Sequence, residues 1–94
     1  MKKVFISGSS GGIGRAITEK FYNNGYLVFA GYNSSEKEIS DMKEKMPGIT
    51  PIKVDVSDSA SVKEAFSKIN GCDILINNAG VAKSIIVVFY LLEL

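Results

Sequence analysis

Glycines at positions 8, 12 and 14 mark the segment of this sequence best suited to holding a ligand. They belong to the run Ser7-Gly8-Ser9-Ser10-Gly11-Gly12-Ile13-Gly14, which follows a short apolar segment and opens an amphipathic one. A strand, a glycine turn and a helix in this order leave N–H groups unpaired at the helix start, where the helix dipole favours phosphate. We expect Gly8 to allow a sharp turn, Gly12 to admit a pyrophosphate, and Gly14 to let the helix pack close to the sheet. Taken by itself, the motif also fits an ordinary glycine-rich loop.

Few other side chains in this sequence could assemble a catalytic or metal site by themselves. The chain has no histidine, and its single cysteine, Cys72, cannot build a zinc site or an internal disulfide. We expect Cys72 to pack as a small apolar residue at a strand edge. The net charge is +1 and the basic residues are scattered, which gives no electrostatic basis for binding nucleic acid or an anionic membrane.

The length and composition indicate one small domain. The 94 residues are 46% hydrophobic and 22% charged, as in an ordinary soluble protein. The basic start Met1-Lys2-Lys3 is followed by an apolar run that ends at Ser7, which is too short for a signal peptide. We therefore expect a cytoplasmic protein.

Short apolar runs alternate with amphipathic segments along the chain. The apolar runs predict strands at 4–7, 27–30, 49–54 and 73–76, with a helix in each interval between them. The order β-α-β-α-β-α-β is typical of an α/β fold with a Rossmann-type doubly wound parallel sheet, of which this chain would hold part. Right-handed crossovers from a central first strand predict the spatial order 3-2-1-4. Pro51 suits an edge strand.

Each predicted helix has an apolar stripe and a stop signal. Asn24-Gly25, Pro47-Gly48 and Asn70-Gly71 are the expected ends, and Ser35 with Glu38 forms a capping-box pattern that opens the second helix. The residues that we expect to face the core are Ile13, Ala16, Ile17 and Phe21 in the first helix, Ile39, Met42 and Met46 in the second, and Val62, Ala65, Phe66 and Ile69 in the third.

Polar clusters follow all four predicted strands, and the carboxyl ends of parallel strands meet at one edge of a sheet. Ligands of doubly wound sheets bind at that edge. Any one cluster could be turn chemistry, but four together favour a bound dinucleotide. The clusters are Ser7 to Gly14, Tyr32 to Ser35, Asp55-Val56, and Asn77 to Gly80.

Three of these clusters resemble the short-chain dehydrogenase/reductase pattern T-G-x-x-x-G-x-G, D-V and N-N-A-G. The resemblance extends over residues 3–81, and the spacing between the motifs also fits. Ser7 stands where the family usually has threonine, a change that keeps the hydroxyl.

The resemblance implies a role for each motif. The Asp55 carboxylate would accept a hydrogen bond from the adenine amino group, with the Val56 backbone beside it, although Asp55 could also be an N-cap-like turn residue. Asn77 is expected to brace the sheet as a buried, fully bonded amide. The pyrophosphate would lie against Gly8, Ser9, Ser10, Gly11, Gly12, Ile13 and Gly14, and the adenine-ribose side would be lined by Asn78, Ala79 and Gly80.

The end of the second strand predicts NADP as the cofactor, with NAD as the alternative. NAD enzymes place an acidic side chain there, which would repel a 2′-phosphate. Here the turn offers Tyr32 and Asn33, with Ser34 and Ser35 as donors. Gly11 stands where NADP-using relatives often carry a basic residue. Arg15 or Lys37 could approach the phosphate, or both could be solvated helix residues.

The family's catalytic Tyr-x-x-x-Lys pair and upstream serine have no counterpart in this sequence. None of the four tyrosines has a lysine four residues later, since Tyr26, Ala30, Glu36 and Leu94 stand there. We expect residues 1–84 to be the cofactor-binding half of a dinucleotide-binding domain, and 85–94 to be an apolar tail outside the family pattern, produced by a frameshift or truncation. The resemblance also implies that the complete enzymes of the family are usually homo-oligomers.

The expected parent activity is carbonyl/alcohol hydride transfer by an NADP-preferring reductase. The resemblance is strongest to 3-oxoacyl-[acyl-carrier-protein] reductase-like members, and elongation factor P 5-aminopentanone reductase is a second candidate. A non-catalytic dinucleotide-binding or regulatory module is the alternative, because such a module needs no active site.

Overall fold

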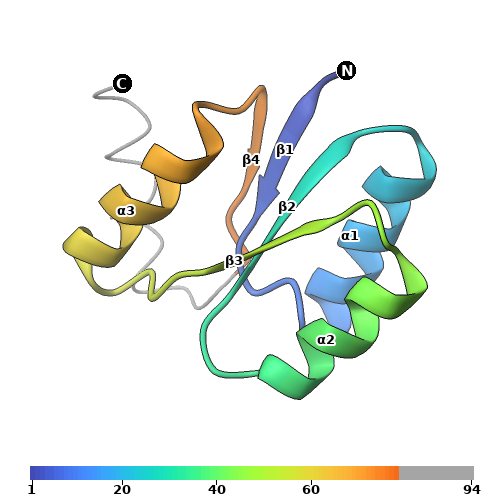
Figure 1. The fold of residues 1–94 in the computed structure, drawn as a ribbon, viewed down its shortest axis with the longest axis horizontal. Helices are drawn as coiled ribbons and strands as arrows, with labels where there is room; N and C mark the ends of the chain where they lie inside the picture. Colours follow the sequence, from blue (N-terminus) through green and yellow to red (C-terminus); the bar gives the residue numbers. More distant parts are fainter. Residues whose placement is uncertain (79–94) are drawn as a thin grey trace.

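Residues 1–78 form a parallel four-stranded sheet with helices on both faces, as described by the computed structural model (Figure 1). The spatial order is β3-β2-β1-β4, which confirms the predicted order and α/β class. The tail predicted at 85–94, and Ala79 and Gly80 of the fourth cluster, lie outside the described residues. The elements are β1 (Lys3–Ile6), α1 (Gly12–Asn23), β2 (Leu27–Tyr32), α2 (Glu36–Lys45), β3 (Thr50–Lys53), α3 (Ser59–Ile69) and β4 (Ile74–Ile76).

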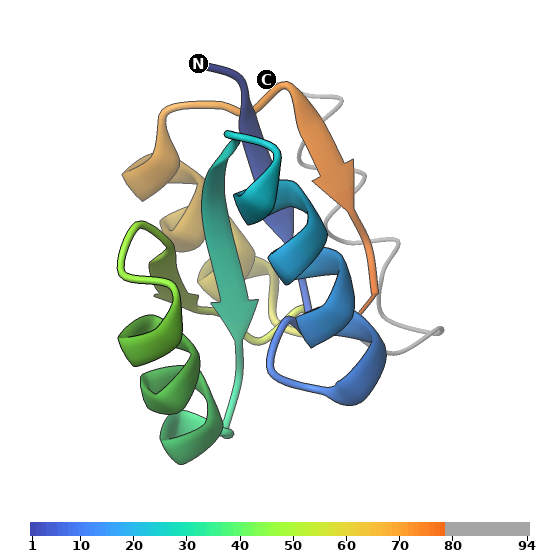
Figure 2. The same cartoon turned by 90° about the vertical axis from the view of Figure 1, so that its right-hand side faces the viewer.

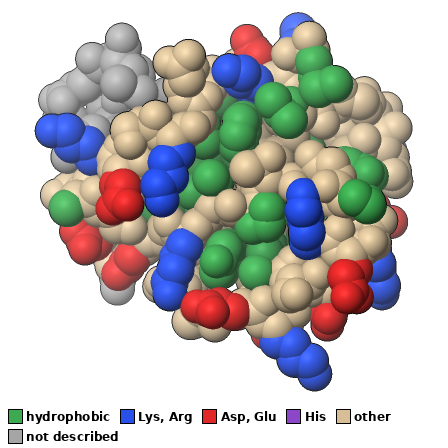
Figure 3. Space-filling model, viewed as in Figure 1, with side chains coloured by type: hydrophobic (Ala, Val, Ile, Leu, Met, Phe, Trp, Pro, Cys, Tyr) green, Lys and Arg blue, Asp and Glu red, His purple; other side chains and the backbone are tan. Residues whose placement is uncertain are grey.

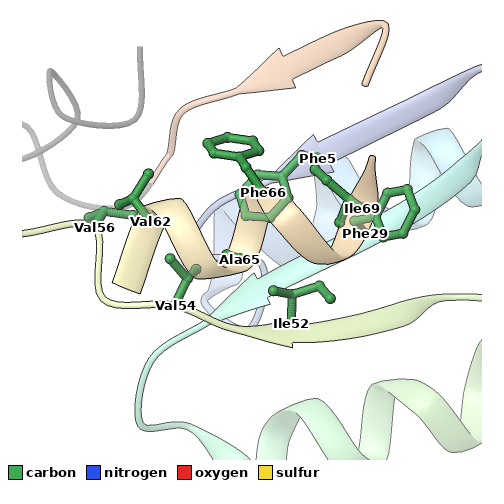
Figure 4. Packing of buried hydrophobic residues seen from close by; sticks show 9 residues of the cluster. All are labelled: Phe5, Phe29, Ile52, Val54, Val56, Val62, Ala65, Phe66 and Ile69. Atoms are coloured by element: carbon green, nitrogen blue, oxygen red, sulfur yellow. The ribbon is translucent and has the colours of Figure 1, made fainter. Parts of the chain in front are cut away.

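Two apolar layers hold the helices to the sheet. Alternate residues of a strand point to opposite faces, so Phe5 packs against α3 while Val4 and Ile6 face α1 and α2. Figure 2 shows α1 and α2 together on one face of the sheet, and Figure 4 shows the cluster under α3, where the Phe5 and Phe66 ring centroids are 5.2 Å apart. The predicted stripes of α2 and α3 are confirmed, because all their residues are buried.

The predicted stripe of α1 is partly wrong. Ile13 is 72% exposed and Ala16 is exposed, whereas Gly14 and Thr18 are buried. The helix docks through Gly14, which lies so close to the preceding loop that this face must turn inward. The apolar periodicity of the sequence did not identify this face of α1, because the buried residues at its centre are a glycine and a threonine.

The capping box predicted at the start of α2 is also wrong. Ser35 occupies the N-cap position, but its side chain accepts no cap hydrogen bond. Its ψ of 61° departs from the extended conformation in which N-cap side chains reach back to the helix. In contrast, Asp58 caps α3 by accepting from the Ala60 N–H at 3.0 Å.

The stop signals and the edge proline are confirmed. Gly25 and Gly71 have φ of 83° and 88° and follow the C-cap residues of α1 and α3, and Pro51 lies in the edge strand β3. β2 extends two residues beyond its predicted end, to Tyr32. None of the described helices is long and apolar enough to cross a bilayer.

Candidate functional site

The glycine loop leaves β1 through a residue that needs glycine. Gly8 has a φ of 62°, which confirms the sharp turn predicted there. The Gly11 N–H points back to the Gly8 carbonyl at 3.4 Å, and α1 begins at the next residue. The loop therefore reverses direction within four residues and brings the start of α1 to the carboxyl edge of the sheet.

Gly14 permits a close contact between α1 and the residues that follow β1 and β4. A Cβ at this position would lie 1.9 Å from the Gly8 carbonyl oxygen and 2.8 Å from the Asn78 Nδ2. The absent side chain thus lets α1 approach its own loop and the segment after β4. These nearest atoms belong to segments that directly follow strands, so α1 approaches the sheet most closely at its carboxyl edge.

The N-terminus of α1 is open in a way that suits an anion. Gly11 provides no side-chain cap, and the first turn holds no acidic residue, whereas α2 has two glutamates there and α3 is capped by Asp58. A Cβ at Gly12 would meet nothing within 4 Å. Unpaired N–H groups, the helix dipole and free space therefore coincide, and these features fit a pyrophosphate.

Hydrogen bonds tie the end of β1 to the end of β4. The buried Ser7 hydroxyl accepts from the Asn78 N–H at 2.9 Å and lies 3.3 Å from the Asn77 Oδ1. The Asn78 side chain donates to the Gly8 carbonyl at 3.1 Å. Asn77 braces this junction as predicted, although it is only half-buried. Asn78 supports the loop from behind, and its contact with the adenine ribose stays a prediction.

A second set of bonds ties the loop to β2. The Ser9 N–H and hydroxyl both donate to the Gly31 carbonyl, each at 2.9 Å. The turn that follows exposes Asn33 and Ser34, whereas Tyr32 and Ser35, the other two residues considered for the ribose 2′ position, are half-buried. Sequence reasoning missed Gly31, although an isolated glycine within an apolar strand signals a close backbone approach.

An exposed ion pair lies next to this turn. The Lys53 ammonium at the end of β3 lies 3.1 Å from the Glu36 carboxylate at the start of α2. Lys53 is also the β3 partner of Tyr32 in the sheet register. The pair was not predicted, because its two members are 17 residues apart and only strand register brings them together.

Asp55 takes part in the turn after β3. Its carboxylate accepts from the Ser57 N–H at 3.0 Å, and its own N–H donates to the Ser61 hydroxyl at 2.9 Å. Its neighbour Val56 is buried. The turn interpretation of Asp55 is therefore confirmed, and the predicted bond to adenine stays a prediction. The Val54 N–H donates to the Tyr32 carbonyl at 2.7 Å, which places this turn beside the end of β2.

The predicted clusters thus gather at one edge, as far as the structure describes them. In Figure 2 the arrowheads of β2 and β4 point to the end where the glycine loop lies. Acidic and basic side chains are interspersed on the face in Figure 3. Residues 1–78 hold no cluster of three or more His, Cys, Asp or Glu side chains suited to a metal ion.

Cys72 lies away from this edge, just before β4 begins. It packs against the cluster under α3, as predicted for a small apolar residue. Burial, and secondarily the Asp73 carboxylate, raise the pKa of its thiol above the ordinary value of 9.0.

Comparisons with known proteins agree with this geometry. A family model described as short chain dehydrogenase matches residues 2–90. The sterol-4-alpha-carboxylate 3-dehydrogenase (decarboxylating) of Dictyostelium discoideum is 40% identical over 79 residues, and a 3-oxoacyl-[acyl-carrier-protein] reductase of Staphylococcus aureus is 31% identical over 90 residues. Among solved structures, the NADPH-bound carbonyl reductase from chicken fatty liver aligns with a TM-score of 0.77 and 27% identity.

The alignments cover most of this chain but a minor part of each relative. They include 84%, 87% and 87% of this chain, and 22%, 37% and 35% of the three relatives in the same order. The relatives are named for different substrates, so the part that they share with this chain is not specific to one substrate.

Proposed function

The chain belongs to the short-chain dehydrogenase family, and we propose that residues 1–78 hold the adenosine and pyrophosphate part of an NADP cofactor. The open N-terminus of α1 carries the proposal. It combines unpaired N–H groups, no first-turn carboxylate and free space at Gly12. The exposed first-turn side chain of Ile13 would cover the bound cofactor.

The preference for NADP rests on the turn after β2. Asn33 and Ser34 are exposed donors there, and the turn contains no carboxylate to repel a 2′-phosphate. Glu36 is the nearest acidic residue in sequence, and its charge is paired with Lys53. Asp55 and Asn78, which flank the same edge, would contact the adenine and its ribose.

The reaction that we propose for the parent enzyme is carbonyl/alcohol hydride transfer, as in 3-oxoacyl-[acyl-carrier-protein] reductase or elongation factor P 5-aminopentanone reductase. When bound, the nicotinamide supplies or accepts the hydride, while this chain binds and orients the other half of the cofactor. No tyrosine here is followed four residues later by lysine, so we expect these 94 residues to bind cofactor without turning over substrate.

A titration of the purified chain with NADPH and NADH tests the proposal. Nicotinamide fluorescence and thermal shift report binding, and we expect NADPH to bind about tenfold more tightly, the effect of one charge-assisted hydrogen bond. Gly12→Asp and Gly12→Asn form a matched pair. Asp would repel the pyrophosphate and abolish binding, whereas Asn would weaken it less. Equal affinity of both variants for NADPH would contradict a pyrophosphate at this position.

A non-catalytic dinucleotide-binding module is the second candidate, because the open N-terminus of α1 can hold a pyrophosphate without any catalytic residue. NADPH-dependent reduction of an acetoacetyl thioester by the chain would contradict this candidate and the expected inactivity alike. Gene context separates the two candidates. A downstream reading frame encoding Tyr-x-x-x-Lys supports the reductase, and an intact 94-residue frame in relatives supports the module.

A further inference from the structure

We propose that the Ser9 side chain is a positioning residue, which holds the glycine loop at a set distance from the turn after β2. The inference rests on the proposed function, because that distance separates the pyrophosphate end of the cofactor from its 2′-phosphate end. The role differs from the direct cofactor contact that the sequence motif predicts for Ser9.

The burial and bonding of Ser9 point away from a ligand. Its side chain is 0% exposed, and its hydroxyl donates at 2.9 Å to the Gly31 carbonyl. The Ser9 N–H donates to the same oxygen at 2.9 Å. Two donors from one loop residue therefore converge on one strand residue, and the hydroxyl is directed toward β2.

The acceptor of these bonds is itself held in place. A Cβ at Gly31 would lie 2.9 Å from the Phe5 Cζ and 3.0 Å from the Ile6 carbonyl oxygen, so β2 is pressed against β1 at this residue. Gly31 lies two residues before Asn33, where the exposed turn begins. A displacement of the loop relative to Gly31 is thus a displacement relative to Asn33 and Ser34.

A displacement of the loop should affect the affinity of ligands that contact both the loop and the turn more than that of ligands that contact only one of them. NADPH would contact the loop through its pyrophosphate and the turn through its 2′-phosphate. Inorganic pyrophosphate would contact only the loop, whereas adenosine 2′-monophosphate would contact the turn and the residues proposed for the adenine and ribose, but not the pyrophosphate site of the loop. Loosening the loop from β2 weakens the ligand that needs both at a defined spacing, and leaves the two fragments largely unaffected.

Ser9→Ala is the variant that tests the proposal. It removes one of the two donors, and the Gly31 carbonyl still accepts the Ser9 N–H, so no buried acceptor loses its last partner. We expect the affinity for NADPH to fall about 3- to 10-fold, the effect of one hydrogen bond. The affinities for pyrophosphate and for adenosine 2′-monophosphate should change by less than about twofold.

Thr18→Val is the matched control. Thr18 is also fully buried, and its hydroxyl donates to the Gly14 carbonyl at 2.8 Å, but this bond lies within α1 and joins no second segment. We expect this variant to lose comparable stability in urea while NADPH and both fragments keep their affinities. The control separates lost spacing from a general loss of stability.

Each outcome decides a different point. A selective loss for NADPH in Ser9→Ala supports the proposal. Parallel losses for NADPH and both fragments, or no loss at all, overturn it while the proposed function stands. If the wild-type chain binds neither NADPH nor the fragments, the proposed function fails, and the positioning role of Ser9 fails with it.

Discussion

Replacing Gly14 with alanine should destabilise the chain strongly, although alanine is the better helix former. The new Cβ would lie 1.9 Å from the Gly8 carbonyl oxygen, about 1.5 Å short of the distance at which ordinary contact begins. The obstacle is backbone, which cannot swing aside as a flexible side chain would. The same Cβ would lie 2.8 Å from the Asn78 Nδ2 and disturb its hydrogen bond to Gly8.

The magnitude follows from opposing effects. Overpacking typically costs about 1–3 kcal/mol, and losing the Asn78 hydrogen bond adds about 1 kcal/mol. The higher helix propensity of alanine returns at most about 1 kcal/mol. We therefore expect Gly14→Ala to lower the free energy of unfolding by about 1–3 kcal/mol.

Gly12→Ala is the matched control, since it makes the same change two residues earlier in the same helix. No atom lies within 4 Å of that Cβ, so the variant should be about 0.4–1 kcal/mol more stable than the wild type. Its methyl group would also occupy the proposed pyrophosphate position and weaken NADPH binding. Stability and affinity therefore change in opposite directions in this variant.

Urea unfolding followed by circular dichroism measures the stability of both variants, and their midpoints can be compared directly when the dependence of the unfolding free energy on urea concentration is the same. With a slope of about 1 kcal/mol per M, Gly14→Ala should lower the midpoint by about 2 M or leave the chain unfolded in buffer. A Gly14→Ala midpoint equal to or above that of the wild type would refute the close contact.

Three further predictions follow from single interactions. Glu36→Gln frees Lys53 from an exposed ion pair, so the NADPH-to-NADH affinity ratio should rise about twofold in titrations; a fall would contradict this. Asp58→Ala should cost about 1 kcal/mol of stability in urea, whereas Ser35→Ala, which removes no cap bond, should cost much less. Because the pKa of the Cys72 thiol is raised in the folded state, half-maximal alkylation should lie above pH 9.0, and stability should fall as pH rises through 9.0. A midpoint below 9.0, or stability unchanged there relative to Cys72→Ala, would contradict it.

The sequence allowed the family and strand order to be predicted, because strand alternation and three spaced motifs are local patterns. The motif-based resemblance is confirmed by the family match over residues 2–90. The missed features depend on contacts between distant segments. Ile13 fits a helical stripe by spacing, yet the contact of Gly14 with the loop turns Ile13 outward.

Features around β2 and α2 were missed for a similar reason, because they depend on how the chain folds and not on local sequence patterns. Gly31 becomes informative only when Ser9 and Phe5 are placed against it. Ser35 matches a capping pattern in sequence. In the structure the Glu36 N–H donates to the Ser34 carbonyl, and this tight turn gives Ser35 a ψ at which its side chain does not cap α2.

The hydrogen bond from Asn78 to the Gly8 carbonyl joins residues 70 positions apart, and it has a consequence for the order of folding. Contacts of such long sequence separation form only after a large loop has closed. We expect β1, β2 and β3 to assemble first and the glycine loop to reach its final shape when β4 joins β1. During synthesis, the earliest-made part of the site would thus be among the last to become ordered.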